Sequence, residues 1–233
     1  MSLPRLKFCG FTREQDIARC IELKVDAIGL NFYQSSKRYV QPHHAKLLSR
    51  LADGHCMRVG VFVDATPQQI DQVLAVCPLD AIQLHGDETP QWLAEYEQSG
   101  YWPRLPILKA LSYRGSIDDS IWRAWVSKHK EPESLLIGFL VDAYDPIQKG
   151  GTGKLANWGL LSPRPSCMLD PEGGYVPFLL AGGLDSQNVI DGLERVNPSG
   201  IDLASGIEDS PGIKDPHKME SVVRAVRNYD AAR

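Results

Sequence analysis

The sequence predicts a (β/α)8 TIM barrel, with residues 1–233 forming a single domain. Three observations lead to this fold class. Short apolar segments alternate with helical segments along the chain and give eight strand–helix units. The strands are mostly continuous apolar runs, as expected for parallel strands that pack inside a barrel and beneath helices. Eight such units in a chain of 233 residues fit a closed barrel better than an open sheet.

The alternative fold is a doubly wound open sheet. Its first strand–helix turn usually carries the pattern G-x-G-x-x-G, in which glycines let the backbone approach a pyrophosphate. The first turn of this chain reads Cys9-Gly10-Phe11-Thr12-Arg13 and lacks that pattern. The sequence therefore favours the barrel.

The expected elements follow one another without a long gap. The strands are Leu6–Gly10, Ala27–Phe32, Met57–Val63, Ala81–His85, Ile107–Leu111, Leu136–Asp142, Phe178–Ala181 and Ile201–Ala204. The helices are Arg13–Leu23, Pro42–Leu51, Pro67–Val76, Pro90–Gln98, Ile117–Val126, a short segment near Asn157–Leu161, Ser186–Arg195 and Pro216–Tyr229. Sequence signals mark three helix starts: a cap at Thr12 with Gln15 three residues later, and proline in the first helical position at Thr66-Pro67 and Asp215-Pro216.

Composition and charge exclude several classes of protein. The net charge of −4 provides no basic face, so we expect no nucleic-acid partner. No apolar run approaches the length of a membrane span, and the N-terminal residues lead directly into a strand without room for a signal peptide. The five cysteines are widely spaced and odd in number, which indicates reduced thiols. The sequence has no C-x-x-C or H-x-x-x-H pair, so we expect no structural zinc site. We therefore expect a cytoplasmic protein without a membrane partner.

Two segments interrupt the strand–helix rhythm. Ala143–Lys154 is polar and glycine-rich and follows the sixth strand, where barrel enzymes often carry a mobile loop. We interpret it as a lid over the site. Ser162–Pro177 contains four prolines and two adjacent glycines. We expect it to be an irregular excursion that decorates the surface.

In a barrel the functional residues lie at the carboxyl ends of the strands. Two glycine-containing turns, Gly182-Gly183 and Ser205-Gly206, follow the seventh and eighth strands. Barrels commonly bind phosphate there, because glycines let backbone N–H groups approach an anion. Ser210-Pro211-Gly212-Ile213 can begin a short helix, and the dipole at the N-terminus of this helix would also attract the phosphate. Each turn alone could be a simple tight turn, but together they predict a phosphate site.

Cys9 and Asp142 are the other candidate pair, each at the end of a strand. Taken singly, Cys9 could be a small buried hydrophobic residue and Asp142 a turn former. Together at one end of a barrel, a thiol and a carboxyl group form a plausible proton donor and acceptor.

Several motifs, in order and at barrel spacing, resemble those of the phosphoribosylanthranilate isomerase family over essentially the whole chain. They are Lys7-Phe8-Cys9-Gly10-Phe11-Thr12-Arg13, Lys37-Arg38-Tyr39-Val40, Val59–Val63, Gln83-Leu84-His85-Gly86, Leu140-Val141-Asp142 followed by Gly150–Lys154, Leu180–Leu184 and Gly200–Glu208. The chain departs from the family pattern at Lys37 and Ala204 and in the length of Ser162–Pro177. None of these departures removes a candidate catalytic residue, so only loop shapes are put in question.

The resemblance implies a role for each candidate residue. Cys9 matches the general base, Asp142 the general acid, and Arg38 the arginine that binds the anthranilate carboxylate. The turns containing Gly182, Gly183, Ser205 and Gly206 match the phosphate site. His85 and Asp202 match polar positions near the site and are expected to support it. His85 could equally be a structural hydrogen-bonding residue, and Asp202 a buried polar support.

The implied reaction is an Amadori rearrangement of N-(5'-phosphoribosyl)anthranilate in tryptophan biosynthesis. It takes a small phosphorylated sugar derivative as substrate and needs no metal and no cofactor, and the chain is expected to act as a monomer or homodimer. Ordinary pKa values would give a carboxylate and a thiol, the reverse of the required acid and base. The site must raise the pKa of Asp142, lower that of Cys9, or move a proton when substrate binds.

Two rival functions stay open. A related isomerase of histidine biosynthesis takes a similar substrate, but an aspartate is expected there in place of Cys9. A non-enzymatic barrel that binds phosphosugars would keep the glycine turns and need neither Cys9 nor Asp142.

Overall fold

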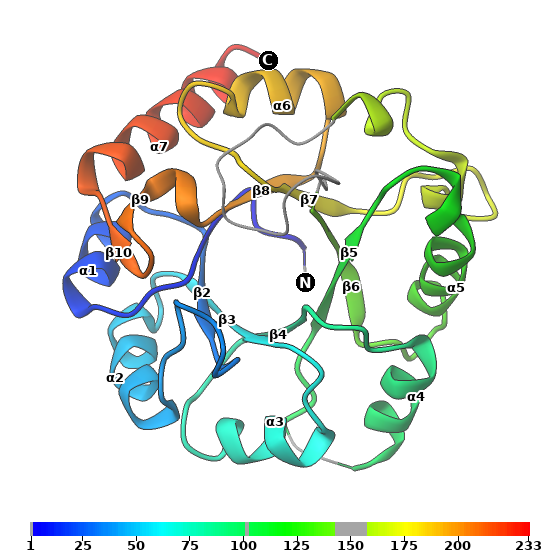
Figure 1. The fold of residues 1–233 in the computed structure, drawn as a ribbon, viewed down its shortest axis with the longest axis horizontal. Coiled ribbons are helices and arrows are strands. Elements are labelled where there is room, and N and C mark those ends of the chain that lie inside the picture. The colour runs from blue at the N-terminus through cyan, green and yellow to red at the C-terminus, as the bar shows by residue number, and fades with distance from the viewer. Residues whose placement is uncertain (1, 101–102, 143–157) are drawn as a thin grey trace.

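A computed structural model describes residues 2–100, 103–142 and 158–233 of the chain. Eight parallel strands form a closed barrel in sequence order, and the first strand pairs with the eighth. The helices surround this barrel as an outer ring (Figure 1). The predicted TIM barrel is therefore confirmed.

The strand bounds are close to those expected from the apolar runs. They are β1 (Leu6–Cys9), β2 (Ala27–Asn31), β3 (Met57–Phe62), β4 (Ala81–Leu84), β5 (Ile107–Ser112), β6 (Leu136–Asp142), β7 (Phe178–Ala181) and β8 (Gly200–Leu203). Two short strands, β9 (Glu208–Ser210) and β10 (Ile213–Lys214), pair antiparallel outside the barrel.

The helices lie between the strands and after the last one. The α-helices are α1 (Glu14–Glu22), α2 (Pro42–Ala52), α3 (Pro67–Leu74), α4 (Pro90–Gln98), α5 (Asp119–His129), α6 (Val189–Val196) and α7 (Pro216–Ala231). Short 3-10 helices are η1 (Ser116–Asp118), η2 (Trp158–Leu161), η3 (Ser166–Met168) and η4 (Ser205–Ile207).

Alternation along each strand separates two apolar cores. Residues that point outward, such as Phe8, Ile28 and Phe139, belong to one large cluster between the barrel and its helices. The barrel interior holds two smaller clusters, one built around Ala27, Val59, Ala81 and Leu108 and the other around Ala110, Leu140, Leu179 and Ala181. Above these apolar layers, the interior becomes polar toward the carboxyl ends of the strands.

The helix-start signals have mixed outcomes. Thr66 caps α3 in a capping box with Gln69, and Asp215 caps α7 by accepting hydrogen bonds from two backbone N–H groups. The cap expected at Thr12 is wrong, because Arg13 occupies the N-cap position of α1 without a side-chain cap. The Thr12 hydroxyl instead donates a hydrogen bond to Gly212 O at 2.5 Å.

Two loop expectations are also corrected. The segment Ser210–Ile213 does not begin a helix; it turns between β9 and β10, so no helix dipole arises there. The excursion Ser162–Pro177 is more than surface decoration, since it buries Met168 and Val176 against the helical side of the barrel. Burying these apolar side chains contributes favourable free energy to folding, which explains why the segment packs against the barrel.

The lid expected over Ala143–Lys154 lies outside the described residues. Within the ranges that the structure describes, no helix is long and apolar enough to cross a membrane.

Candidate functional site

The candidate acid and base lie at the same end of the barrel because each ends a parallel strand. Cys9 is the last residue of β1 and Asp142 is the last residue of β6. The strands β7 and β8 separate them around the barrel wall. The loops that follow β7 and β8 carry the candidate phosphate-binding glycines, so the acid and base flank these loops. This is the end where barrel enzymes carry out their chemistry.

A buried ion pair lies beneath Cys9. Lys7 on β1 is in register with Asp202 on β8, and Lys7 Nζ is 2.8 Å from Asp202 Oδ1. Because side chains two residues apart on a strand share a face, Lys7 and Cys9 both point into the barrel. The charges of Lys7 and Asp202 both reach the thiol.

The Cys9 thiol has a raised pKa. Burial is the largest cause, and the negative charge of Asp202 adds to it, whereas the ammonium groups of Lys7 and Lys214 act in the opposite direction. Gly29 on the neighbouring strand β2 gives the sulfur its space, since a Cβ there would lie 2.6 Å from Cys9 Sγ. A lowered pKa at Cys9, one of the options expected from the sequence, is therefore wrong.

The Asp142 carboxyl group also has a raised pKa. Burial is the main cause and Asp202 contributes, while the His85 side chain opposes it. A raised pKa favours the protonated carboxyl group, which is the form that can donate a proton. Raising the pKa of Asp142 by burial was one of the options expected from the sequence, and the direction is confirmed.

His85 faces Asp142 from the end of β4. Burial lowers the pKa of the imidazole, so the neutral ring predominates at neutral pH. Gln83 Nε2 lies 2.7 Å from His85 Nδ1. With the Gln83 amide nitrogen assigned as the donor, the proton of the neutral imidazole is on Nε2.

A cavity of about 610 Å³ begins at His85 and Asp142 and extends over β5 toward α5. A buried ion pair lines this cavity, with Lys109 Nζ 2.7 Å from Glu88 Oε2. The Glu88 carboxylate also accepts hydrogen bonds from the backbone N–H groups of Asp64 and Gly86. This network fixes the loop that carries His85.

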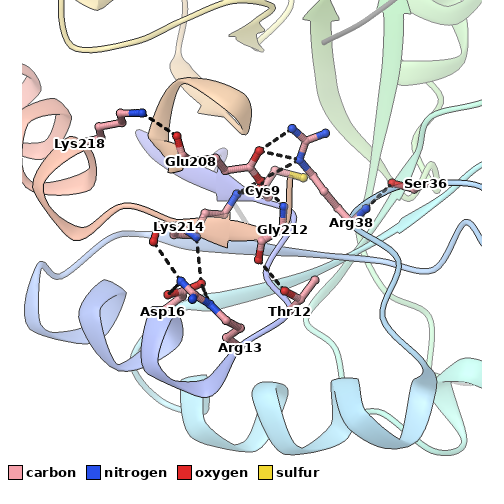
Figure 2. Close-up of polar contacts among 10 residues, drawn as sticks. All are labelled: Cys9, Thr12, Arg13, Asp16, Ser36, Arg38, Glu208, Gly212, Lys214 and Lys218. Atoms are coloured by element: carbon pink, nitrogen blue, oxygen red, sulfur yellow. Dashed lines mark hydrogen bonds and ion pairs between the residues drawn. The ribbon is translucent and has the colours of Figure 1, made fainter. Parts of the chain in front are cut away.

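Arg38 lies in the loop between β2 and α2 and contacts a residue that the sequence did not single out. Its Nε and Nη2 atoms donate to the two carboxylate oxygens of Glu208, with the shortest distance 2.5 Å (Figure 2). Lys214 Nζ donates to Glu208 Oε1 at 2.8 Å and to Cys9 O at 2.5 Å. Arg38, Glu208 and Lys214 thus form a charged cluster against Cys9.

Glu208 and Lys214 were missed as site residues although Glu208 ends one of the motifs that carry the family resemblance. Their positions after the eighth strand are a weak signal, because the residues that they contact lie far away in the sequence. Burial raises the pKa of the Glu208 carboxyl group, but hydrogen bonds and charges from Arg38 and Lys214 outweigh it, so the pKa is lowered. Glu208 is therefore ionised at neutral pH.

The two glycine turns expected to bind phosphate lie next to each other. Gly182 and Gly183 have φ values of +90° and +66°, which favour glycine. A Cβ on Gly206 would lie only 1.9 Å from Leu184 O, so the two turns approach as closely as backbones can. Among the described residues, no acceptor pairs with the backbone N–H groups of Gly183 and Gly206. These N–H groups are available to an anion.

No group of three or more His, Cys, Asp and Glu side chains within the described ranges could hold a metal ion.

The model of the family described as "N-(5'phosphoribosyl)anthranilate (PRA) isomerase" matches residues 6–225. The N-(5'-phosphoribosyl)anthranilate isomerase of Ralstonia nicotianae is 37% identical over 98% of this chain and 94% of that protein. The protein of the same name from Myxococcus xanthus is 38% identical over 97% of each chain. These relatives share nearly full length with this chain.

Solved structures agree with this relationship. Phosphoribosyl anthranilate isomerase from Thermotoga maritima has a TM-score of 0.79 and 29% identity, covering 97% of this chain and 100% of that one. A phosphoribosyl anthranilate isomerase in complex with reduced 1-(o-carboxyphenylamino)-1-deoxyribulose 5-phosphate has a TM-score of 0.76 and 27% identity, with the same coverage. The chain is therefore a member of the N-(5'-phosphoribosyl)anthranilate isomerase family, whose members are isomerases of tryptophan biosynthesis.

Proposed function

We propose that this chain isomerises N-(5'-phosphoribosyl)anthranilate to 1-(2-carboxyphenylamino)-1-deoxyribulose 5-phosphate, with Asp142 as general acid and Cys9 as general base. The observation that carries the proposal is the placement of the two groups on either side of the paired glycine turns. A phosphate bound at Gly183 and Gly206 would hold the sugar between them.

The first step opens the sugar ring. Asp142 donates its proton to the furanose ring oxygen, the C1'–O bond breaks, and the nitrogen lone pair forms the C1'=N bond of a protonated Schiff base. The raised pKa of Asp142 supports this role, because more of the carboxyl group is protonated at neutral pH than in an exposed aspartate. The lowered pKa of His85 disfavours transfer of this proton to the imidazole, so the proton stays on the carboxyl group.

The second step removes the C2' proton. The Cys9 thiolate takes this proton, and the C2'–H electrons form the C1'=C2' bond while the C1'=N electrons return to nitrogen. The resulting enolamine tautomerises to the ketone product. The raised pKa of Cys9 means that the thiolate is the minor form, and the nearby ammonium of Lys7 favours it. The active enzyme thus needs a protonated Asp142 together with a Cys9 thiolate, the reverse of the ordinary protonation of a carboxyl and a thiol group.

Arg38 is the proposed partner of the anthranilate carboxylate, since a guanidinium group binds a carboxylate through paired hydrogen bonds. His85 and Asp202 are proposed as supporting residues, with Asp202 acting on Cys9 through its own charge and as the ion-pair partner of Lys7. The cytoplasmic location, the single domain and the monomeric or homodimeric state expected from the sequence stay predictions.

Loss of anthranilate fluorescence during turnover of N-(5'-phosphoribosyl)anthranilate tests the proposal. Conversion of this substrate is expected, and conversion of the similar substrate of the histidine-pathway isomerase is not. Turnover of the second substrate alone would assign the rival isomerase. Binding of phosphosugars without turnover of either would identify a non-enzymatic barrel.

A further inference from the structure

Glu208 is the centre of the charged cluster against Cys9. Its carboxylate is buried, with a side-chain exposure of 3%, and it accepts hydrogen bonds from Arg38, from Lys214 and from the backbone N–H of Gly212. Figure 2 shows Arg38 and Lys214 reaching the carboxylate from two sides. One carboxylate thus faces two cations, which leaves one positive charge for an incoming anion.

The way in which Glu208 binds Arg38 leaves one edge of the guanidinium group open. Glu208 takes the edge formed by Nε and Nη2. Within the described part of the chain, no residue accepts a hydrogen bond from Arg38 Nη1. A guanidinium group has five N–H donors in a planar fork, so its Nη1–Nη2 edge can still bind a second carboxylate.

Backbone contacts hold both members of the pair in place. The hairpin of β9 and β10 carries Glu208, and Lys218 Nζ donates to Glu208 O at 2.7 Å. On the other side, the stem of Arg38 packs on Gly10, where a Cβ would lie 2.4 Å from Arg38 Cδ. Arg38 therefore has little freedom to turn while Glu208 is paired with it.

We propose that Glu208 is a positioning residue that sets the preference of the site for a carboxylate on the aryl group of the substrate. It does so by occupying the Nε–Nη2 edge of Arg38 and presenting the Nη1–Nη2 edge to the ligand. This inference rests on the proposed function. Among the described residues, Glu208 forms no hydrogen bond with Cys9 or Asp142, and in this proposal it affects ligand binding through Arg38.

The test compares two ligands that differ only in the carboxylate. Reduced 1-(o-carboxyphenylamino)-1-deoxyribulose 5-phosphate is the first probe, and the phenylamino compound without the carboxyl group is the second. In Glu208→Gln, the dissociation constant of the first probe and the KM of the substrate should rise about ten-fold, the effect of misaligning a charge-assisted hydrogen bond. The second probe should bind as in the wild type, and kcat should change little.

Asp80→Asn is the matched control. Asp80 pairs with Arg58 through the same Nε–Nη2 edge, with distances of 2.8 and 2.6 Å, at the opposite end of the barrel. Breaking this pair should leave the binding of both probes unchanged. Glu208→Asp keeps the charge that Lys214 faces but shortens the side chain, so it provides a second variant should Glu208→Gln fail to fold. Glu208→Asp should also weaken the binding of the first probe and leave the binding of the second probe unchanged.

Equal losses for both probes, or unchanged binding of the first, would overturn the inference. A loss confined to kcat would do so as well, because it would place the effect of Glu208 on Lys214 and Cys9 instead of Arg38. The wild type separates this inference from the proposed function. A wild type that binds the first probe but does not convert the substrate refutes the function, and the probe comparison still decides the role of Glu208. A wild type that binds neither probe refutes both.

Discussion

Lys7 and Asp202 face each other across the seam that closes the barrel, and their ion pair has opposite effects on one thiol. The pair lies directly beneath Cys9, with Lys7 Nζ 2.8 Å from Asp202 Oδ1. Lys7 lowers the pKa of Cys9, and Asp202 raises it. The seam between β1 and β8 thus places two opposite charges that act on the basicity of the thiol.

We expect the two partners to shift the Cys9 titration in opposite directions. Lys7→Gln should raise the pKa of Cys9, because it removes the positive charge that favours the thiolate, and Asp202→Asn should lower it. The pH dependence of the alkylation rate reports the thiolate, and Cys9 is partly exposed whereas the other four cysteines are buried. Cys9→Ala gives the background rate. Shifts in the same direction for both variants would contradict this account of the seam.

The acid–base assignment predicts large losses of turnover. Cys9→Ala and Asp142→Asn should each lower kcat at least about 100-fold, the usual contribution of a general acid or base. Folding should be retained, because each group lies at a strand end and not within the apolar core. Near-wild-type turnover in either variant would remove that residue from the mechanism.

The same assignment fixes the shape of the pH profile of kcat/KM. The active form needs Asp142 protonated and Cys9 deprotonated, the reverse of the ordinary order of carboxyl and thiol pKa values. Under this condition activity falls on the acid side below the pKa of Asp142 and on the alkaline side above the pKa of Cys9. Both pKa values are raised, so both limits should lie above those of ordinary carboxyl and thiol groups. The residual activity of Asp142→Asn should lose the fall on the alkaline side, because above the pKa of Cys9 that fall reflects loss of the Asp142 proton, and it should keep the fall in acid, where the thiolate becomes protonated.

Arg38→Lys tests the proposed carboxylate partner. Lysine cannot bind Glu208 and a substrate carboxylate through two separate edges, so binding of anthranilate-bearing ligands should weaken about ten-fold or more. Phosphate-only ligands should bind as they do to the wild type. Equal losses for both kinds of ligand would show that Arg38 supports the structure as a whole.

Local sequence patterns predicted the barrel well because strands and helices depend on apolar periodicity and turn chemistry. The bounds of β6 and α4 agree with the structure residue for residue. Thr12 is where this reasoning failed. Its sequence pattern predicts a cap, but its hydroxyl bonds to Gly212, about 200 positions away in the chain. A long-range contact of this kind leaves no trace in the local pattern.

For the site too, local rules identified some residues, and residues that depend on long-range contacts were missed. The rule that barrel sites lie at strand ends selected Cys9, Asp142 and the glycine turns, and the structure brings them to one end of the barrel. Glu208 could not be selected in this way, because its role depends on Arg38, 170 positions earlier. The burial that raises the pKa values of Cys9 and Asp142 arises from the packing of strands that lie far apart in the sequence.

Asp142 should weaken the fold at neutral pH. Its pKa is raised in the folded state, so folding is opposed wherever the carboxyl group must be ionised, above the folded pKa. The opposition fades as the pH falls through that pKa, and it is absent below the unfolded pKa, where the group is neutral in both states. Asp142→Asn should therefore have a higher Tm than the wild type at pH about 7. The two proteins should converge in acid, as measured by thermal unfolding. A Tm at or below that of the wild type at neutral pH would argue against a buried, destabilising carboxylate.

Gly206→Ala tests the phosphate site. The added Cβ would lie 1.9 Å from Leu184 O and 2.9 Å from Leu184 C, so the turns after β7 and β8 must separate. Because the N–H groups of Gly183 and Gly206 would no longer converge, the inhibition constant of inorganic phosphate should rise at least about ten-fold. Gly54→Ala is the control, since Gly54 has a φ of +72° but open space around it and lies between α2 and β3 at the far end of the barrel. It should cost some stability through backbone strain and leave the phosphate constant unchanged. If a folded Gly206→Ala protein binds phosphate as tightly as the wild type, the phosphate must lie elsewhere than between these two turns.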